Sequence, residues 1–302
     1  MKHSKIAIIG AGSVGTTTAY ALMMKHIAAE IILVDINEKR CRGEILDLSD
    51  AISFCCTSKL KTGTIKEAGQ ADIIIIAAGA RQKLDQPRSE LININQKIIR
   101  SIIKDMQPIQ KDAIIIMVTN PMDVLECVAQ EESGLPKKQV LGSGTYLDSQ
   151  RLRNILAQKL NIAEQSIQAY VLGEHGDSQF VAWSIAQIAG IPILDFPGIT
   201  EKKLETIATQ TKNKVYELIE CKGSTFYGIA ACLADICSCI LFNQKRIIPI
   251  SSYHEKYQSC FSLPTVLGES GIEEVLPVKL NQKEQQLLEQ SAEKIKTMLK
   301  DI

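Results

Sequence analysis

The chain has 302 residues, 34 basic and 34 acidic side chains, and 45% hydrophobic residues. This length and apolar content predict two closely packed domains with sizeable cores and argue against disorder. The balanced charge leaves no electrostatic footprint for nucleic acid or an anionic membrane surface, so small neutral or mildly anionic ligands fit better.

The first ten residues run from a short basic patch into a strand-like segment, so no secretion signal is expected. The longest apolar runs, residues 73–80 and 113–118, are far shorter than the roughly 20 residues that cross a bilayer. The nine cysteines have no CxxC spacing, and Cys232, Cys237 and Cys239 lie in an apolar helical stretch. Buried, reduced thiols and a cytoplasmic location are therefore expected, with no metal site.

The first half of the chain alternates between strand and helix patterns. Short apolar runs predict strands at residues 5–9, 30–34, 72–77, 113–118 and 139–141. Amphipathic spacing predicts helices at residues 14–24, 38–53, 89–106 and 122–131. This alternation is typical of an α/β fold with a Rossmann-type, doubly wound parallel sheet.

The second half has a different pattern. Helices are predicted at residues 148–160, 200–220 and 282–300, and they enclose strand-like runs at residues 168–171, 181–188 and 247–253. This order suggests an α+β substrate domain. The boundary near residues 142–145 is short, so we expect domains at 1–143 and 144–302 that share a cleft.

Gly10, Gly12 and Gly15 form a dinucleotide fingerprint directly after the first predicted strand. The first glycine permits a tight turn, the second a close approach of the backbone to a pyrophosphate, and the third close packing of helix against sheet. Asp35 ends the next strand, 20 residues after Gly15. A carboxylate at this place binds the adenosine ribose and repels a 2′-phosphate, which favours NAD over NADP. A solvated strand-end carboxylate is the alternative interpretation of Asp35.

His175 lies in the segment Gly173-Glu174-His175-Gly176-Asp177, between two glycines and two carboxylates. A histidine with a pKa near neutrality can donate and accept a proton. Together with a bound dinucleotide, it indicates a dehydrogenase.

The chain resembles the lactate and malate dehydrogenase family over nearly its whole length. The resemblance rests on motifs that occur in the family's order: residues 10–15, Val118-Thr119-Asn120-Pro121, residues 142–145 followed by 147–149 and Arg151, the histidine segment, and residues 222–230. The family implies an NAD-dependent L-2-hydroxy acid dehydrogenase that interconverts pyruvate and L-lactate.

The resemblance also implies roles for single residues. His175 would be the proton donor and acceptor, oriented by Asp148, and Arg151 would hold the substrate carboxylate through paired hydrogen bonds. Arg88 would close over the substrate and polarise its carbonyl group. Asn120 and Thr225 would line the substrate pocket. Besides the fingerprint, the implied cofactor contacts are Val14, Gly79, Thr119 and Asn120.

Substrate choice is expected to depend on Gln82, since the family places glutamine here in pyruvate reductases and arginine in oxaloacetate reductases. The segment 80–88 lacks the family's usual glycine and has Pro87 before Arg88. A shift of one residue would exchange Gln82 with Arg81 and invert the choice. Malate, or a bulkier 2-hydroxy acid, therefore remains an alternative substrate, and a catalytically silent NAD-binding scaffold is the non-enzymatic alternative.

Many bacterial relatives are activated by fructose 1,6-bisphosphate through an arginine and a histidine. Arg153 matches the arginine, but Gln168 occupies the histidine's place. One cationic phosphate ligand is thus missing, which puts activation in doubt. The family is tetrameric, so a homotetramer is expected, with a dimer possible, and no nucleic-acid or membrane partner.

Overall fold

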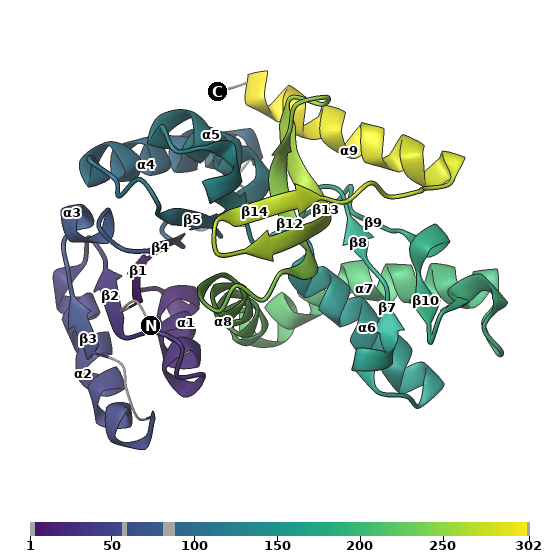
Figure 1. Ribbon diagram of the computed structural model, residues 1–302, viewed down its shortest axis with the longest axis horizontal. Helices are drawn as coiled ribbons and strands as arrows, with labels where there is room; N and C mark the ends of the chain where they lie inside the picture. Colours follow the sequence, from purple (N-terminus) through teal and green to yellow (C-terminus); the bar gives the residue numbers. More distant parts are fainter. Residues whose placement is uncertain (1–3, 56–58, 81–87, 301–302) are drawn as a thin grey trace.

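The computed structural model describes residues 4–55, 59–80 and 88–300. A nine-stranded sheet forms its centre, with the strand order β14-β13-β12-β6-β5-β4-β1-β2-β3 (Figure 1). Six strands from the first half run parallel: β1 (Lys5–Ile9), β2 (Glu30–Val34), β3 (Lys59–Thr62), β4 (Ile73–Ile76), β5 (Ile114–Met117) and β6 (Val140–Gly142). Three antiparallel strands from the second half extend the sheet beyond β6: β12 (Arg246–His254), β13 (Ser259–Gly268) and β14 (Gly271–Val275).

Helices cover both faces of the parallel strands because the strands are apolar on both sides. In β1, Ile6 and Ile8 belong to one core cluster, whereas Ala7 and Ile9 belong to another on the opposite face. The first cluster includes side chains of α1 (Ser13–Met24), α2 (Glu38–Cys55) and α8 (Tyr227–Leu241). The second includes side chains of α3 (Ile65–Ala68), α4 (Arg88–Met106) and α5 (Met122–Ser133).

The second half also contains α6 (Tyr146–Leu160), α7 (Glu201–Lys222) and α9 (Gln282–Lys300), whose apolar side chains belong to two further core clusters. Two small sheets accompany these helices. One contains β7 (Ile167–Gln168), β10 (Gln187–Ile188) and β11 (Ile191–Pro192), and the other contains β8 (Val171–Leu172) and β9 (Phe180–Val181).

The expected fold class is confirmed, but some element predictions were wrong. The run 168–171 is split between β7 and β8, and 181–188 is interrupted by a 3-10 turn at Trp183–Ile185. The strand β3 was not predicted, because its side chains are exposed or half-buried and so give no apolar run. The eight described cysteines carry free thiols, and no described helix is long and apolar enough to cross a membrane.

Candidate active site

The glycines of the fingerprint bring the β1–α1 turn close to the neighbouring strand. Gly10 has a φ of +109°, and a Cβ there would lie 2.8 Å from the Ala78 nitrogen. A Cβ on Gly15 would lie 1.9 Å from the Gly10 oxygen, whereas one on Gly12 would meet nothing within 4 Å. The turn is thus tight on its protein side and open at Gly12, where a pyrophosphate needs bare backbone.

Asp35 lies beside this turn at the end of β2. Its Oδ2 accepts a hydrogen bond from the Ala11 nitrogen at 2.6 Å, and its Oδ1 accepts one from the Asn37 nitrogen at 2.8 Å. The half-buried carboxylate therefore has a fixed orientation next to the glycines. This arrangement fits a dinucleotide whose ribose hydroxyls hydrogen-bond to a carboxylate.

The other predicted cofactor residues follow β4 and β5 or belong to α1. Gly79 must be glycine because a Cβ would lie 2.3 Å from Thr119 Cγ2. Buried Thr119 donates its hydroxyl to the Ala78 oxygen at 2.8 Å. Asn120 is exposed just after β5, and Val14 is half-buried in α1. Because β1, β4 and β5 are adjacent and parallel, their carboxyl ends bring these residues to one edge of the sheet.

Asn95, which was not predicted, connects two of these segments. Its side chain is buried in α4, accepts from the Ala80 nitrogen at 2.7 Å and donates to the Asn120 oxygen at 2.8 Å. No motif marks it, because asparagine within an amphipathic helix is ordinarily a surface residue.

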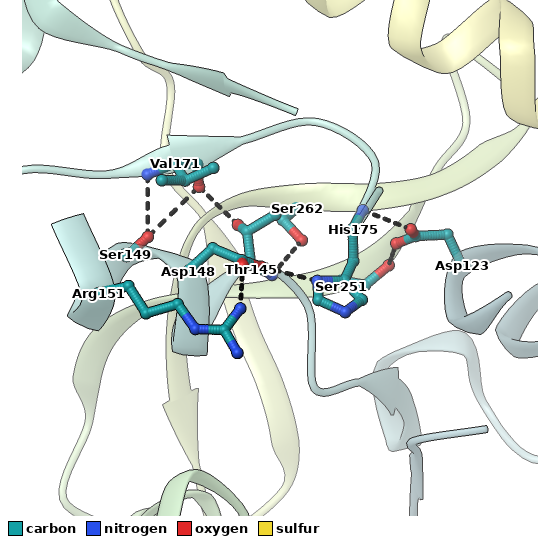
Figure 2. Close-up of polar contacts among 9 residues, drawn as sticks. All are labelled: Asp123, Thr145, Asp148, Ser149, Arg151, Val171, His175, Ser251 and Ser262. Atoms are coloured by element: carbon teal, nitrogen blue, oxygen red, sulfur yellow. Dashed lines mark hydrogen bonds and ion pairs between the residues drawn. The ribbon is translucent and has the colours of Figure 1, made fainter. Parts of the chain in front are cut away.

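Asp148, Arg151 and His175 form a hydrogen-bonded group (Figure 2). Asp148 and Arg151 are three residues apart in α6 and therefore share one face of the helix. Arg151 Nη1 donates to Asp148 Oδ1 at 2.9 Å, and His175 Nδ1 lies 2.7 Å from Asp148 Oδ2. The side chains of Asp148 and Arg151 are 3% and 8% exposed, whereas that of His175 is 28% exposed. The imidazole can thus reach a ligand while its carboxylate partner stays away from water.

The charges in this group favour a protonated histidine. Burial by itself would lower the pKa of His175, but the charge and hydrogen bond of Asp148, together with the Asp123 carboxylate, raise it above the usual value. Burial would raise the pKa of Asp148, but His175 and Arg151 outweigh that effect and lower it. Asp148 is therefore a carboxylate at neutral pH, which leaves His175 Nε2 as the atom that can give or take a proton.

Several hydrogen bonds hold the loop that carries His175. The His175 nitrogen donates to Asp123 Oδ2 at 2.7 Å, and Asp123 Oδ1 accepts from Ser251 Oγ at 2.7 Å (Figure 2). Gly173 pairs with Ser262 of β13 in an antiparallel bridge. Lys294 of α9 donates to Glu174 Oε2 at 2.7 Å. Asp123 and Ser251 were not predicted, because neither stands in a motif that sets it apart from surface residues.

The glycines of the segment 142–145 allow β12 to lie close to this segment and to α5. A Cβ on Gly142 would lie 2.0 Å from Met122 Sδ and 3.0 Å from Ser251 Cβ. Gly144 has a φ of +59°, and a Cβ there would lie 2.5 Å from the Ser251 nitrogen. These two glycines therefore allow Ser251 to reach Asp123 on α5.

Gln82, Arg88 and Thr225 are the remaining predicted site residues. Gln82 and the neighbouring Arg81 lie outside the described residues. Arg88 begins α4, but its side chain also lies outside them. Thr225 is half-buried between α7 and α8.

Arg153 and Gln168, considered above for a sugar bisphosphate, both have protein partners. Arg153 Nε donates to the Ala169 oxygen at 3.1 Å, and its guanidinium lies 5.2 Å from the centre of the Tyr170 ring. Gln168 Oε1 accepts from Gln187 Nε2 at 2.5 Å.

A family model described as lactate/malate dehydrogenase, NAD binding domain, matches residues 4–142, and one described as lactate/malate dehydrogenase, alpha/beta C-terminal domain, matches residues 145–302. The chain belongs to the lactate/malate dehydrogenase family. This membership confirms the resemblance drawn from the motifs. It also confirms NAD as the cofactor and the chain as an NAD-dependent dehydrogenase.

Relatives within the lactate/malate dehydrogenase family match along almost their whole length. L-lactate dehydrogenase A of Rhizopus oryzae is 48% identical, with 98% of this chain and 92% of the relative covered. L-lactate dehydrogenase of Clostridium botulinum (strain Loch Maree / Type A3) is 40% identical, with 98% and 96% covered. Among solved structures, the minor L-lactate dehydrogenase of Enterococcus mundtii has a TM-score of 0.96 at 33% identity, with 100% of this chain and 99% of that chain covered. A lactate dehydrogenase enzyme from a deep-sea metagenome library of the Medee basin has a TM-score of 0.95 at 35% identity, with the same coverage.

Proposed function

We propose that this protein is an L-lactate dehydrogenase that reversibly reduces pyruvate to L-lactate. The observation that carries the proposal is the hydrogen-bonded group of Asp148, His175 and Arg151 in a chain with an NAD-binding half. Two close relatives named L-lactate dehydrogenase, at 48% and 40% identity, support the substrate class.

His175 acts as the proton donor during reduction and as the acceptor during oxidation. Its Nδ1 is engaged by Asp148 at 2.7 Å, so the transferred proton is held on Nε2. Bound to the NAD-binding half, NADH would supply the hydride that reduces the ketone carbon. The protonated imidazole gives its proton to the ketone oxygen as negative charge develops there.

Arg151 binds the substrate carboxylate. A guanidinium has five N–H donors in a planar fork, and Asp148 accepts from Nη1. Two parallel hydrogen bonds to a carboxylate fix both the position and the orientation of the substrate, which a lysine at the same place could not do. Asp148 thus sets the direction of Arg151 and His175 together, since it binds both.

We propose that Arg88 polarises the carbonyl group and that Gln82 selects pyruvate over oxaloacetate. A second substrate carboxylate that met an uncharged amide in a dry pocket would lack a charge partner and bind worse by several kcal/mol. Asn120 and Thr225 complete the substrate pocket. Residues 1–143 bind the cofactor and residues 144–302 supply the proton-transfer group.

A cytoplasmic homotetramer is the assembly we propose. Large apolar side chains on the outside of the chain support association, among them Phe54 on α2 at 85% exposure and Tyr227 on α8 at 68%. The free thiols of the eight described cysteines fit a reducing compartment. Light scattering of the eluted protein measures the mass of the assembly.

The test is NADH oxidation by the purified protein with pyruvate, oxaloacetate or 2-oxoisocaproate. We expect at least a hundredfold preference for pyruvate. His175→Asn should bind NADH normally and lose most turnover, while the matched variant His26→Asn should behave as wild type. His26 is an exposed histidine with a φ of 54°, which asparagine tolerates.

Preference for oxaloacetate would indicate a malate dehydrogenase with Arg81 at the selecting position. NADH binding without turnover on any of the three ketoacids would favour the catalytically silent scaffold.

A further inference from the structure

Two carboxylates reach His175 from different sides. Asp148 binds the ring through Nδ1, whereas Asp123 binds the main-chain nitrogen at 2.7 Å (Figure 2). The ring contact belongs to the proton-transfer group described above. The main-chain contact comes from a separate element, α5, whose first turn carries Asp123.

Asp123 is held without access to water. It is 2% exposed, and its second oxygen accepts from Ser251 Oγ at 2.7 Å. Both oxygens thus have a donor, which orients the carboxylate and leaves it no freedom to turn away from the His175 nitrogen. A hydrogen bond to a buried ionised carboxylate is shorter and stronger than one between neutral groups.

The buried position of Asp123 disfavours its charged form. Burial raises its pKa to about 6, although the hydrogen bond from Ser251 and the attraction of His175 act in the opposite direction. The other titratable groups facing it are Glu174 beside His175, Glu126 in α5 and Cys260 in β13. None of these three carries a positive charge, so His175 is the cation that the Asp123 charge can stabilise. Arg151 is the cation on the other side of His175, where its charge opposes protonation of the ring.

We propose that Asp123 is a second positioning residue for His175, which fixes the main chain of the catalytic loop and stabilises the protonated imidazole with its negative charge. The proposal deepens the proposed function and rests on the proton-transfer role of His175. Asp148 then sets the tautomer of the ring, and Asp123 sets where the ring is placed and how readily it holds a proton.

The variant Asp123→Asn separates charge from shape. Its amide oxygen can still accept from the His175 nitrogen, and its NH2 group can donate to Ser251 Oγ, so the geometry is kept while the charge is lost. Removal of a nearby negative charge makes the protonated imidazole less stable, and the pKa of His175 must fall. We expect a fall of at least about half a pH unit. That shift corresponds to roughly a threefold lower protonated fraction above the midpoint.

The direct measurement is an NMR pH titration of the whole protein labelled with ¹³Cε1-histidine. The chain has four histidines, so the spectrum is simple and His175→Asn identifies the His175 signal. The matched control is Asp112→Asn. It removes an exposed carboxylate that precedes the first residue of β5, whereas Asp123 follows the last residue of that strand. Its His175 midpoint should equal that of wild type. Thermal unfolding of each variant shows whether it is folded.

A His175 midpoint in Asp123→Asn within about 0.2 pH units of wild type would overturn the proposal. If the variant does not fold, the wild-type titration decides: protonation of Asp123 should appear as a second step in the His175 signal below its main midpoint. The absence of a second step at every lower pH at which the protein stays folded would overturn the proposal. The titration needs no substrate, so a failure of the lactate dehydrogenase assignment, seen as absent turnover, is distinguishable from a failure of this inference.

Discussion

Replacement of Asp148 by asparagine should lower the rate of pyruvate reduction, and the size of the loss follows from the two hydrogen bonds that Asp148 accepts. The buried carboxylate accepts from His175 Nδ1 at 2.7 Å and from Arg151 Nη1 at 2.9 Å. A hydrogen bond to a charged group contributes about 1.5–3 kcal/mol, and one between neutral groups about 0.5–1.5 kcal/mol. Asparagine has one acceptor oxygen, and its NH2 group cannot accept, so one of these two hydrogen bonds is lost. That loss costs about 1.5–3 kcal/mol, which is roughly 13- to 160-fold in rate.

The assay is kcat/KM for pyruvate at saturating NADH across the pH range from about 5.5 to 9. Asp148 raises the pKa of His175 against the effect of burial, so its loss lowers that pKa and deprotonates the histidine at high pH. The loss of activity should therefore be larger at pH 8 than at pH 6, with NADH affinity unchanged. Asp195→Asn, at an exposed carboxylate of the same half of the chain, should match wild type. A loss below threefold at every pH would refute the assignment of Asp148 as the partner of His175.

Three further predictions concern specificity, activation and stability. Gln82→Arg should shift the preference from pyruvate to oxaloacetate, measured as the ratio of the two kcat/KM values; a shift with Arg81→Gln instead would mean that the neighbouring position selects the substrate. Fructose 1,6-bisphosphate should leave kcat/KM for pyruvate unchanged, because Gln168 is uncharged and Arg153 already donates to Ala169, and a lowered KM would contradict this. Burial lowers the pKa of His254 to about 4, so the unfolded chain binds the extra proton first and the folded protein loses stability as pH falls from about 6.5 towards 4. His254→Gln should therefore show a smaller drop in Tm between pH 7 and pH 5 than wild type, measured by scanning calorimetry. An equal drop in the two proteins would contradict this prediction.

The parallel part of the fold could be predicted because its signal is local. The four consecutive isoleucines of β4 are all buried, and such a short run of β-branched residues is typical of a strand covered on both faces. The strand β3 could not be predicted in this way, since Lys59, Lys61 and Thr62 give an edge strand no apolar pattern. The pairing of β12 with β6 was also beyond reach, because it depends on contacts between residues more than 100 positions apart.

Some residues of the candidate site could likewise be predicted from the sequence, and others could not. His175, Asp148 and Arg151 were identified because they stand in motifs, and the structure places them in one hydrogen-bonded group. Asp123 and Asn95 are buried side chains that hydrogen-bond to main-chain atoms of other segments. No regular spacing in the sequence marks a side chain that bonds to the main chain of a distant segment, so such a residue is found only from the folded structure.

The single continuous sheet has a consequence for how the chain can be divided. Strand β6 pairs with β5 on one side and, through Gly142 and Ser251, with β12 on the other. A fragment that ended at residue 143 would leave β6 as a bare edge, and unpaired edges recruit strands from other molecules. The cofactor-binding half is therefore a poor candidate for expression alone or for exchange between relatives, and a chimaera should carry β12 to β14 along with it.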